Sequence, residues 1–204
     1  MDGEKIGRLN FAIEDAIPAM RDAAASNANA QLRVRVVTFS SGARWHVAEA
    51  TDIEQFSWTA VTAGGVTDMG QAIRLVAEQL QMPPMEQRAL PPILALISDG
   101  QPTDDFAGAL AKLDGLPWGK KAVRIAIGVG QDTDLDVLGK FIGPKSELRP
   151  LEANNAQELV NYIKWVSTAV INAASAPASG SGQDDGLAVP IPQPPAPGDG
   201  NDVW

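Results

Sequence analysis

Apolar residues along the chain follow two kinds of spacing, one helical and one extended. Over residues 4–25 they recur three and four positions apart, which predicts an amphipathic helix with Pro18 inside it. Residues 32–40 then alternate as in a strand. Residues 44–48 predict a short antiparallel partner strand after a Ser-Gly turn. The chain therefore opens with a helix and a hairpin.

The remainder predicts strands that alternate with helices. The expected elements are a helix from Thr67 to about Gln81, a buried strand at 93–98, a helix to about Leu113 with Asp104 as its N-cap, a strand at 122–129, a short helix opened by Asp134, a short strand at 147–151 and a long helix at 155–173. This order predicts an α/β fold, a doubly wound and mostly parallel sheet flanked by helices on both faces.

The composition changes near residue 176. The stretch 176–204 is rich in Pro, Gly, Ser and Asp and holds six of the fifteen prolines. Such a segment buries too little apolar surface to fold alone. We therefore predict one domain over 1–175 and a disordered or extended tail over 176–204.

Charge and composition exclude several function classes. The net charge is −9, and because the tail holds four Asp and no Lys or Arg, the body remains mildly acidic. An acidic body argues against a nucleic-acid partner. The chain has no cysteine, which excludes disulfides, thiolate zinc sites and a cysteine nucleophile. No apolar run reaches membrane-spanning length and no signal-peptide pattern is present, so we expect a cytoplasmic protein without a membrane partner.

The strongest chemical signal is the stretch 93–105. Its apolar run Ile-Leu-Ala-Leu-Ile-Ser stops at Asp99, and Gly-Gln-Pro-Thr-Asp-Asp follows. The pattern predicts a buried strand that carries Asp99 to its carboxyl end, where open α/β sheets place their ligand sites.

Several motifs together resemble the von Willebrand factor type A domain, and within it the bacterial tellurium-resistance TerY-type proteins. The resemblance runs from Met1 to about Ala173. The stretches that carry it are Gly3–Ile6, Val37–Ser40, Gly64–Gly70, Ile97–Asp105, Ala126–Gly130, Asp134–Leu138 and Lys164–Ser167.

The resemblance implies a metal-ion-dependent adhesion site, in which three loops at the carboxyl edge of the sheet hold a divalent cation, usually Mg²⁺. It maps the second loop's ligand onto Thr67 and the third loop's onto Asp99. The first loop, Asp-x-Ser-x-Ser, and the central strand before it have no counterpart here. The residues that the resemblance implies for partner binding are Gly65, Asp68, Gln101 and Pro102.

The missing strand and loop have two consequences. Mg²⁺ prefers six oxygens at roughly 2.0–2.1 Å, so one carboxylate and one hydroxyl predict weak or absent binding. Loss of a central strand removes about 10 kcal/mol of stabilisation from buried apolar side chains, which is comparable to the net stability of a whole domain. It also leaves two sheet edges unpaired. We therefore expect a truncated version of a longer protein, most simply through a start codon assigned too late. The alternative hypothesis is that the truncation is real and that the domain has lost its metal.

The leading functional hypothesis is a non-enzymatic protein-interaction module. The resemblance implies bacterial stress or tellurite-resistance signalling, a partner that presents a carboxylate, and a kinase or PP2C-like phosphatase as the guessed partner. One alternative is a metal-dependent phosphoryl-transfer or hydrolase domain using Asp99, although a second strand-end carboxylate and a phosphate-binding Lys loop are missing and His46 is the sole histidine. Another alternative is a metal-free structural remnant.

Overall fold

The computed structural model describes residues 1, 3–27, 31–86, 89–131, 133–144, 146–174 and 191–196. Most of the predicted tail, 176–190 and 197–204, lies outside these residues. Within the tail, residues 191–196 are described, form neither helix nor strand, and place Ile191 against the main core.

The elements follow the predicted alternation. They are α1 (Gly3–Ala25), β1 (Arg33–Ser40), β2 (Gly42–Asp52), α2 (Met69–Gln79), β3 (Ile93–Ser98), α3 (Phe106–Gly115), α4 (Pro117–Lys121), β4 (Val123–Val129), α5 (Leu135–Ile142), β5 (Leu151–Ala153), α6 (Ala156–Trp165), the π-helix η1 (Val166–Val170) and α7 (Ile171–Ala174).

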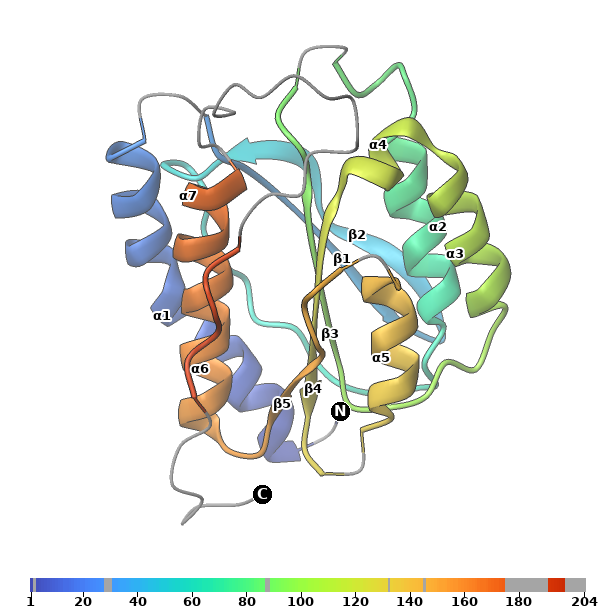
Figure 1. Ribbon diagram of the computed structural model, residues 1–204. Helices are drawn as coiled ribbons and strands as arrows, with labels where there is room; N and C mark the ends of the chain where they lie inside the picture. The colour runs from blue at the N-terminus through green and yellow to red at the C-terminus, as the bar shows by residue number, and fades with distance from the viewer. Residues whose placement is uncertain are drawn as a thin grey trace.

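The strands form two sheets. β3, β4 and β5 are parallel, with β4 in the middle, and β1 pairs with β2 as an antiparallel hairpin. Figure 1 shows α1 and α6 on one side of the parallel sheet, α2, α3 and α5 on the other, and the hairpin passing behind β3. The predicted α/β architecture, a parallel sheet flanked by helices, is thus confirmed, although the described strands are divided between two sheets.

Several predicted boundaries were wrong, and three of them concern β2, the last helix and the last strand. β2 extends well beyond 44–48, because β1 pairs with it as far as Arg33 opposite Asp52, at an exposed end with little apolar alternation. The helix predicted over 155–173 changes at Val166 into a π-helix, where the Thr168 hydroxyl donates to the Lys164 carbonyl at 2.8 Å and competes with the helical hydrogen bonds. The last strand lies at Leu151–Ala153 rather than at 147–151.

Two large apolar clusters fill the space beside the parallel sheet. One joins α1 and α6 to β4, and the other joins α2, α3 and α5 to β3 and β4. All seven residues of β4 are buried, as the middle position requires. A smaller cluster joins the C-terminal half of α1 to the hairpin, with Ile17 beside Val34 and Val36.

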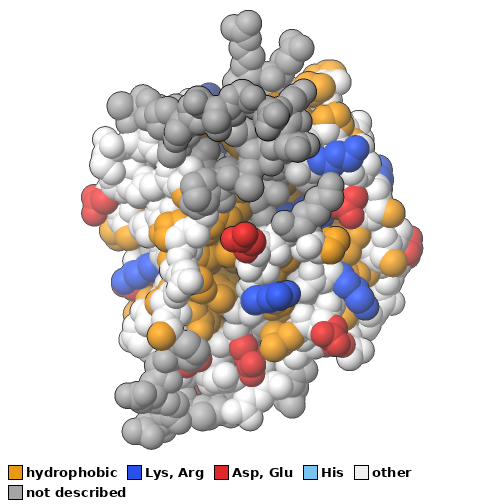
Figure 2. All heavy atoms as spheres, viewed as in Figure 1, with side chains coloured by type: hydrophobic (Ala, Val, Ile, Leu, Met, Phe, Trp, Pro, Cys, Tyr) orange, Lys and Arg blue, Asp and Glu red, His pale blue; other side chains and the backbone are white. Residues whose placement is uncertain are grey.

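Charged side chains are dispersed rather than clustered on the face drawn in Figure 2, where acidic and basic groups alternate among apolar and uncharged ones. Of the helices that the structure describes, none has the length and apolarity to cross a membrane.

The only tyrosine of the chain gives a direct probe of this packing. Tyr162 on α6 is 2% exposed, and burial raises the pKa of its phenol, with further raising by the charges of Glu158 and Glu152. Because the folded state holds this proton more tightly, its contribution to stability is present below pH ~10 and is lost as the pH rises through the folded pKa. We expect tyrosinate absorbance to appear at higher pH in the native chain than in the urea-unfolded chain. Coincident titration curves would contradict the burial.

Candidate functional site

Three loops meet at the carboxyl ends of β1 and β3. The Asp68 amide donates to the carbonyl of Ser40, the last residue of β1, at 3.0 Å. The Thr103 amide, in the loop after β3, donates to the Thr67 carbonyl at 2.9 Å. We call the surface formed by residues 40–42, 64–68 and 99–105 the loop edge.

Asp99 lies where the sequence predicts, directly after β3. Both carboxylate oxygens of Asp99 lie 2.7 Å from the Met1 amino nitrogen. The Asp99 side chain is 18% exposed and the Met1 side chain is 11% exposed.

Thr67 lies beside Gly100, the residue after this acid, and is not the start of the helix as the pattern predicted. A Cβ built on Gly100 would lie 3.2 Å from the Thr67 hydroxyl oxygen, so that hydroxyl adjoins the residue after Asp99. The helix itself begins at Met69, with Asp68 as its N-cap residue. Thr67 is instead held by the loop after β3, because its amide donates to the Thr103 hydroxyl at 3.0 Å.

Asp104 is not the N-cap of α3, which corrects the prediction. Asp105 has that position and accepts from the Gly108 amide at 3.0 Å. The Asp104 carboxylate turns to α2 instead and accepts from the amides of Gly70 and Gln71, at 2.8 and 2.7 Å. It thereby satisfies two of the free amides at the start of that helix, and its negative charge suits the positive end of the helix dipole.

Asp68 connects all three loops through its side chain. One carboxylate oxygen accepts from the Gly42 amide at 2.7 Å and from the Gln71 side chain at 2.9 Å, and the other accepts from the Thr103 hydroxyl at 2.9 Å. Asp68, implied as a partner-binding residue, therefore organises the loop edge from within.

The other implied partner-binding residues lie on the same surface. Gly65 is exposed, has a φ of +78°, and approaches the hairpin turn so closely that a Cβ would lie 2.6 Å from the Ser41 hydroxyl oxygen. Gln101 is exposed and donates to the Asp134 carboxylate at 2.9 Å, which links the loops after β3 and β4. Pro102, beside it, is half-buried.

The residues at the loop edge do not fit a magnesium site. Of the residues implied as ligands, Asp99 offers one carboxylate and Thr67 one hydroxyl, whereas Mg²⁺ prefers about six oxygens in octahedral geometry. The Asp68 and Asp104 carboxylates already accept hydrogen bonds from amides of the hairpin turn and of α2. Across the part of the chain that the structure describes, no group of three or more acidic or histidine side chains is placed to hold a metal ion.

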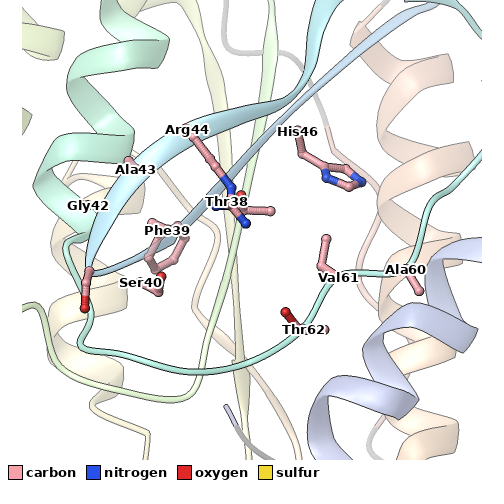
Figure 3. Close-up of a pocket in the computed structure, with 11 residues that line it drawn as sticks. Thr38, Phe39, Ser40, Gly42, Ala43, Arg44, His46, Ala60, Val61 and Thr62 are labelled. Carbon is pink, nitrogen blue, oxygen red and sulfur yellow. The ribbon is translucent and has the colours of Figure 1, made fainter.

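A cavity that sequence reasoning missed lies next to the hairpin. It has a volume of about 370 Å³ and is lined by residues 38–44, His46 and residues 60–62 (Figure 3). Neither Thr67 nor Asp99 lines it. The Thr38 hydroxyl oxygen, at its wall, is buried without a hydrogen-bond partner. No local sequence signal marks this cavity, because its walls come from two strands and a distant loop.

Comparisons with known proteins found a matching family model and solved structures of similar fold. The model of the von Willebrand factor type A domain matches residues 5–164. Two similar solved structures are proximal thread matrix protein 1 from the mussel byssus, with 20% identity and a TM-score of 0.58, and a von Willebrand factor type A protein from Catenulispora acidiphila, with 15% identity and a TM-score of 0.56. Each match covers 80% of this chain but only 42% and 38% of those structures. No curated protein sequence matches significantly.

Proposed function

The chain belongs to the von Willebrand factor type A domain family, and from that premise we propose that it is a non-enzymatic module that binds a partner protein through its loop edge. The supporting observation is the way in which the acids of this edge are used. Asp68 and Asp104 hold the three loops together, so these carboxylates build a surface rather than a reaction centre.

We further propose that partner binding depends little on metal. Among the described residues, the donor set at Thr67 and Asp99 is too small for Mg²⁺. A partner must therefore be recognised by the exposed surface around Gly65, Gln101 and Pro102, rather than by a shared cation.

The cellular role that we propose follows the motif resemblance. Gly64–Gly70 and Ile97–Asp105 resemble the TerY-type branch of the family, which favours a cytoplasmic protein of bacterial stress or tellurite-resistance signalling. A kinase or a PP2C-like phosphatase is then the partner to test first.

The dependence on metal is tested by affinity capture with the immobilised chain, in Mg²⁺ and in EDTA, with the recovered proteins quantified by mass spectrometry. We expect partner recovery to change less than about twofold on chelation, because one carboxylate and one hydroxyl make a weak magnesium site. Calorimetric titration of the free chain with MgCl₂ is expected to give no saturable binding. Loss of the partner in EDTA, together with tight Mg²⁺ binding that Asp99→Asn abolishes, would contradict the proposal.

The role of the loop edge is tested separately. Gln101→Arg places a bulky charge on the exposed edge and is expected to reduce partner recovery at least about tenfold, because charge at an interface centre is costly. Ala107→Arg, at an exposed position of α3, makes the same kind of change outside the loop edge and should leave recovery unchanged. Equal recovery with both variants would place the interface elsewhere.

A further inference from the structure

One stretch of the proline-rich tail lies against the folded domain. Residues 191–196, Ile-Pro-Gln-Pro-Pro-Ala, form neither helix nor strand, and Ile191 packs against the apolar cluster that joins α1 and α6 to β4. Figure 1 shows this stretch, drawn in red, passing along α6. We call residues 191–196 the proline strap. It shares no residue with the loop edge, and the interaction proposed there does not use it.

Burial along the proline strap follows a period of three residues. Ile191 and Pro194 are half-buried, whereas Gln193 and Ala196 are exposed. A polyproline II helix has three residues per turn, so residues i and i+3 lie on one edge of it. Three of the six strap residues are proline, whose ring fixes φ at about −65°, close to the value that this helix needs. The strap therefore has the pattern of a polyproline II segment that lies lengthwise on the domain, with one edge inward and one outward.

α6 is buried around most of its circumference. Its only exposed residues are Gln157 and Asn161, which lie one turn apart and form a single narrow row. The parallel sheet covers one side of this helix and α1 covers another, where Lys164 pairs with Asp15 of α1 at 2.6 Å. A surface helix commonly keeps one whole face polar. The strap accounts for the additional cover, because it passes along α6 and its Ile191 joins the same cluster (Figure 1).

The side chains that α6 contributes to this cluster suit proline. They include Tyr162 and Trp165. Aromatic surfaces are where proline-rich segments dock, because the segment is already extended and loses little conformational entropy on binding. A polyproline II segment also has no internal hydrogen bonds, so its outward carbonyls stay in water while one edge packs. α6 thus offers an apolar and partly aromatic surface to a preformed segment.

We propose that the flank of α6 is a binding site for polyproline II segments, and that the proline strap occupies this site as a ligand from the same chain. Ile191 and Pro194 enter the site, and Gln193 and Ala196 face solvent. A tethered ligand acts at an effective concentration of the order of 1 mM, so a proline-rich segment of another protein binds only by displacing the strap. The strap therefore controls access to a second interaction surface, separate from the loop edge.

The first test compares two doubly substituted full-length chains with the unmodified chain. The inward variant carries Ile191→Asp and Pro194→Asp, and the matched outward variant carries Gln193→Asp and Ala196→Asp, so each adds two negative charges to the strap. The probe is a fluorescein-labelled synthetic peptide with the sequence of residues 191–196, and fluorescence anisotropy measures its binding. Circular dichroism checks that all three chains fold.

We expect the inward variant, whose site is free, to bind the peptide at least about tenfold more tightly than the other two chains. A strap at an effective concentration of about 1 mM weakens a peptide with a dissociation constant of about 0.1 mM by roughly this factor. Equal affinity for all three chains, or no binding to the inward variant, would overturn the proposal. So would a dimer of the unmodified chain that the inward variant does not form in sedimentation, because the strap of a second copy then fills the site.

The second test measures the cover on α6 by amide hydrogen exchange, without added peptide. In the inward variant we expect exchange in residues 156–165 to be at least about threefold faster than in the unmodified chain, and exchange in α2 to be unchanged. The outward variant should match the unmodified chain in both helices. Equal rates in α6 for the two variants would overturn the proposal. Equal acceleration of α6 and α2 would also overturn it, because the substitutions would then loosen the whole domain rather than uncover one site.

Discussion

Replacing Gly70 with alanine is expected to lower the free energy of unfolding by about 3 kcal/mol, since overpacking against backbone cannot relax by a rotamer change. Gly70 lies in the first turn of α2, against the loop after β3. A Cβ there would lie 2.7 Å from the Asp105 carbonyl oxygen and 2.9 Å from its carbonyl carbon. The loop would have to retreat, and the Asp104 carboxylate, which caps α2, would retreat with it.

Urea unfolding followed by circular dichroism measures this loss. Gly115→Ala, at the end of α3, is the matched control, because nothing lies within 4 Å of the added methyl group. We expect that control to be neutral or stabilising by up to about 1 kcal/mol. A Gly70→Ala chain as stable as the control would show that α2 and the loop are not packed as described.

Replacing Arg124 with alanine is the second change with a large expected effect. Arg124 lies on β4, all of whose residues are buried. Its guanidinium donates to the Gly119 carbonyl at 2.8 Å and to the Phe141 carbonyl at 3.3 Å. The same group forms an ion pair with Asp114 at 2.6 Å. Truncation leaves a cavity and two carbonyls without their donor. We expect a loss of about 3 kcal/mol, mainly from lost packing and from the two buried carbonyls left without a donor, because the Asp114 side chain is largely exposed.

The comparison variant is Arg8→Ala, which breaks an exposed Arg8–Glu4 pair one helical turn apart on α1. Exposed pairs of this kind contribute at most about 0.5 kcal/mol. Arg124→Lys should also be destabilising, because an ammonium cannot reproduce the planar fork that reaches both carbonyls. If chemical denaturation gives Arg124→Ala and Arg8→Ala the same midpoint, burial of the Arg124 guanidinium contributes nothing.

Local patterns in the sequence located most of the fold. The apolar run at 93–98 predicted β3 and placed Asp99 at its end, since both signals lie within a few adjacent residues. The roles of Asp104 and Asp68 could not be predicted in the same way. Asp104 caps a helix that begins 35 residues earlier in the chain, and Asp68 contacts loops 26 and 35 residues away. Each carries the local signature of an N-cap, and tertiary packing decides which amides it meets.

The division of the strands into two sheets could be predicted from the sequence only in part. The strand patterns themselves contain nothing about pairing. The expectation of unpaired edges came from the resemblance alone, through the prediction that its central strand has no counterpart among these residues. The cavity beside the hairpin had no such signal, since Thr38 and Thr62 come together through chain reversal alone.

The bridging carboxylates give the loop edge a mechanical property. Because Asp104 belongs to the loop after β3 but holds the first turn of α2, whatever pulls that loop outward also uncaps the helix. Thr103, bonded to both Thr67 and Asp68, transmits the same displacement to the hairpin turn through Gly42. Fraying at the start of α2 is therefore the expected internal consequence when a binding partner displaces these loops.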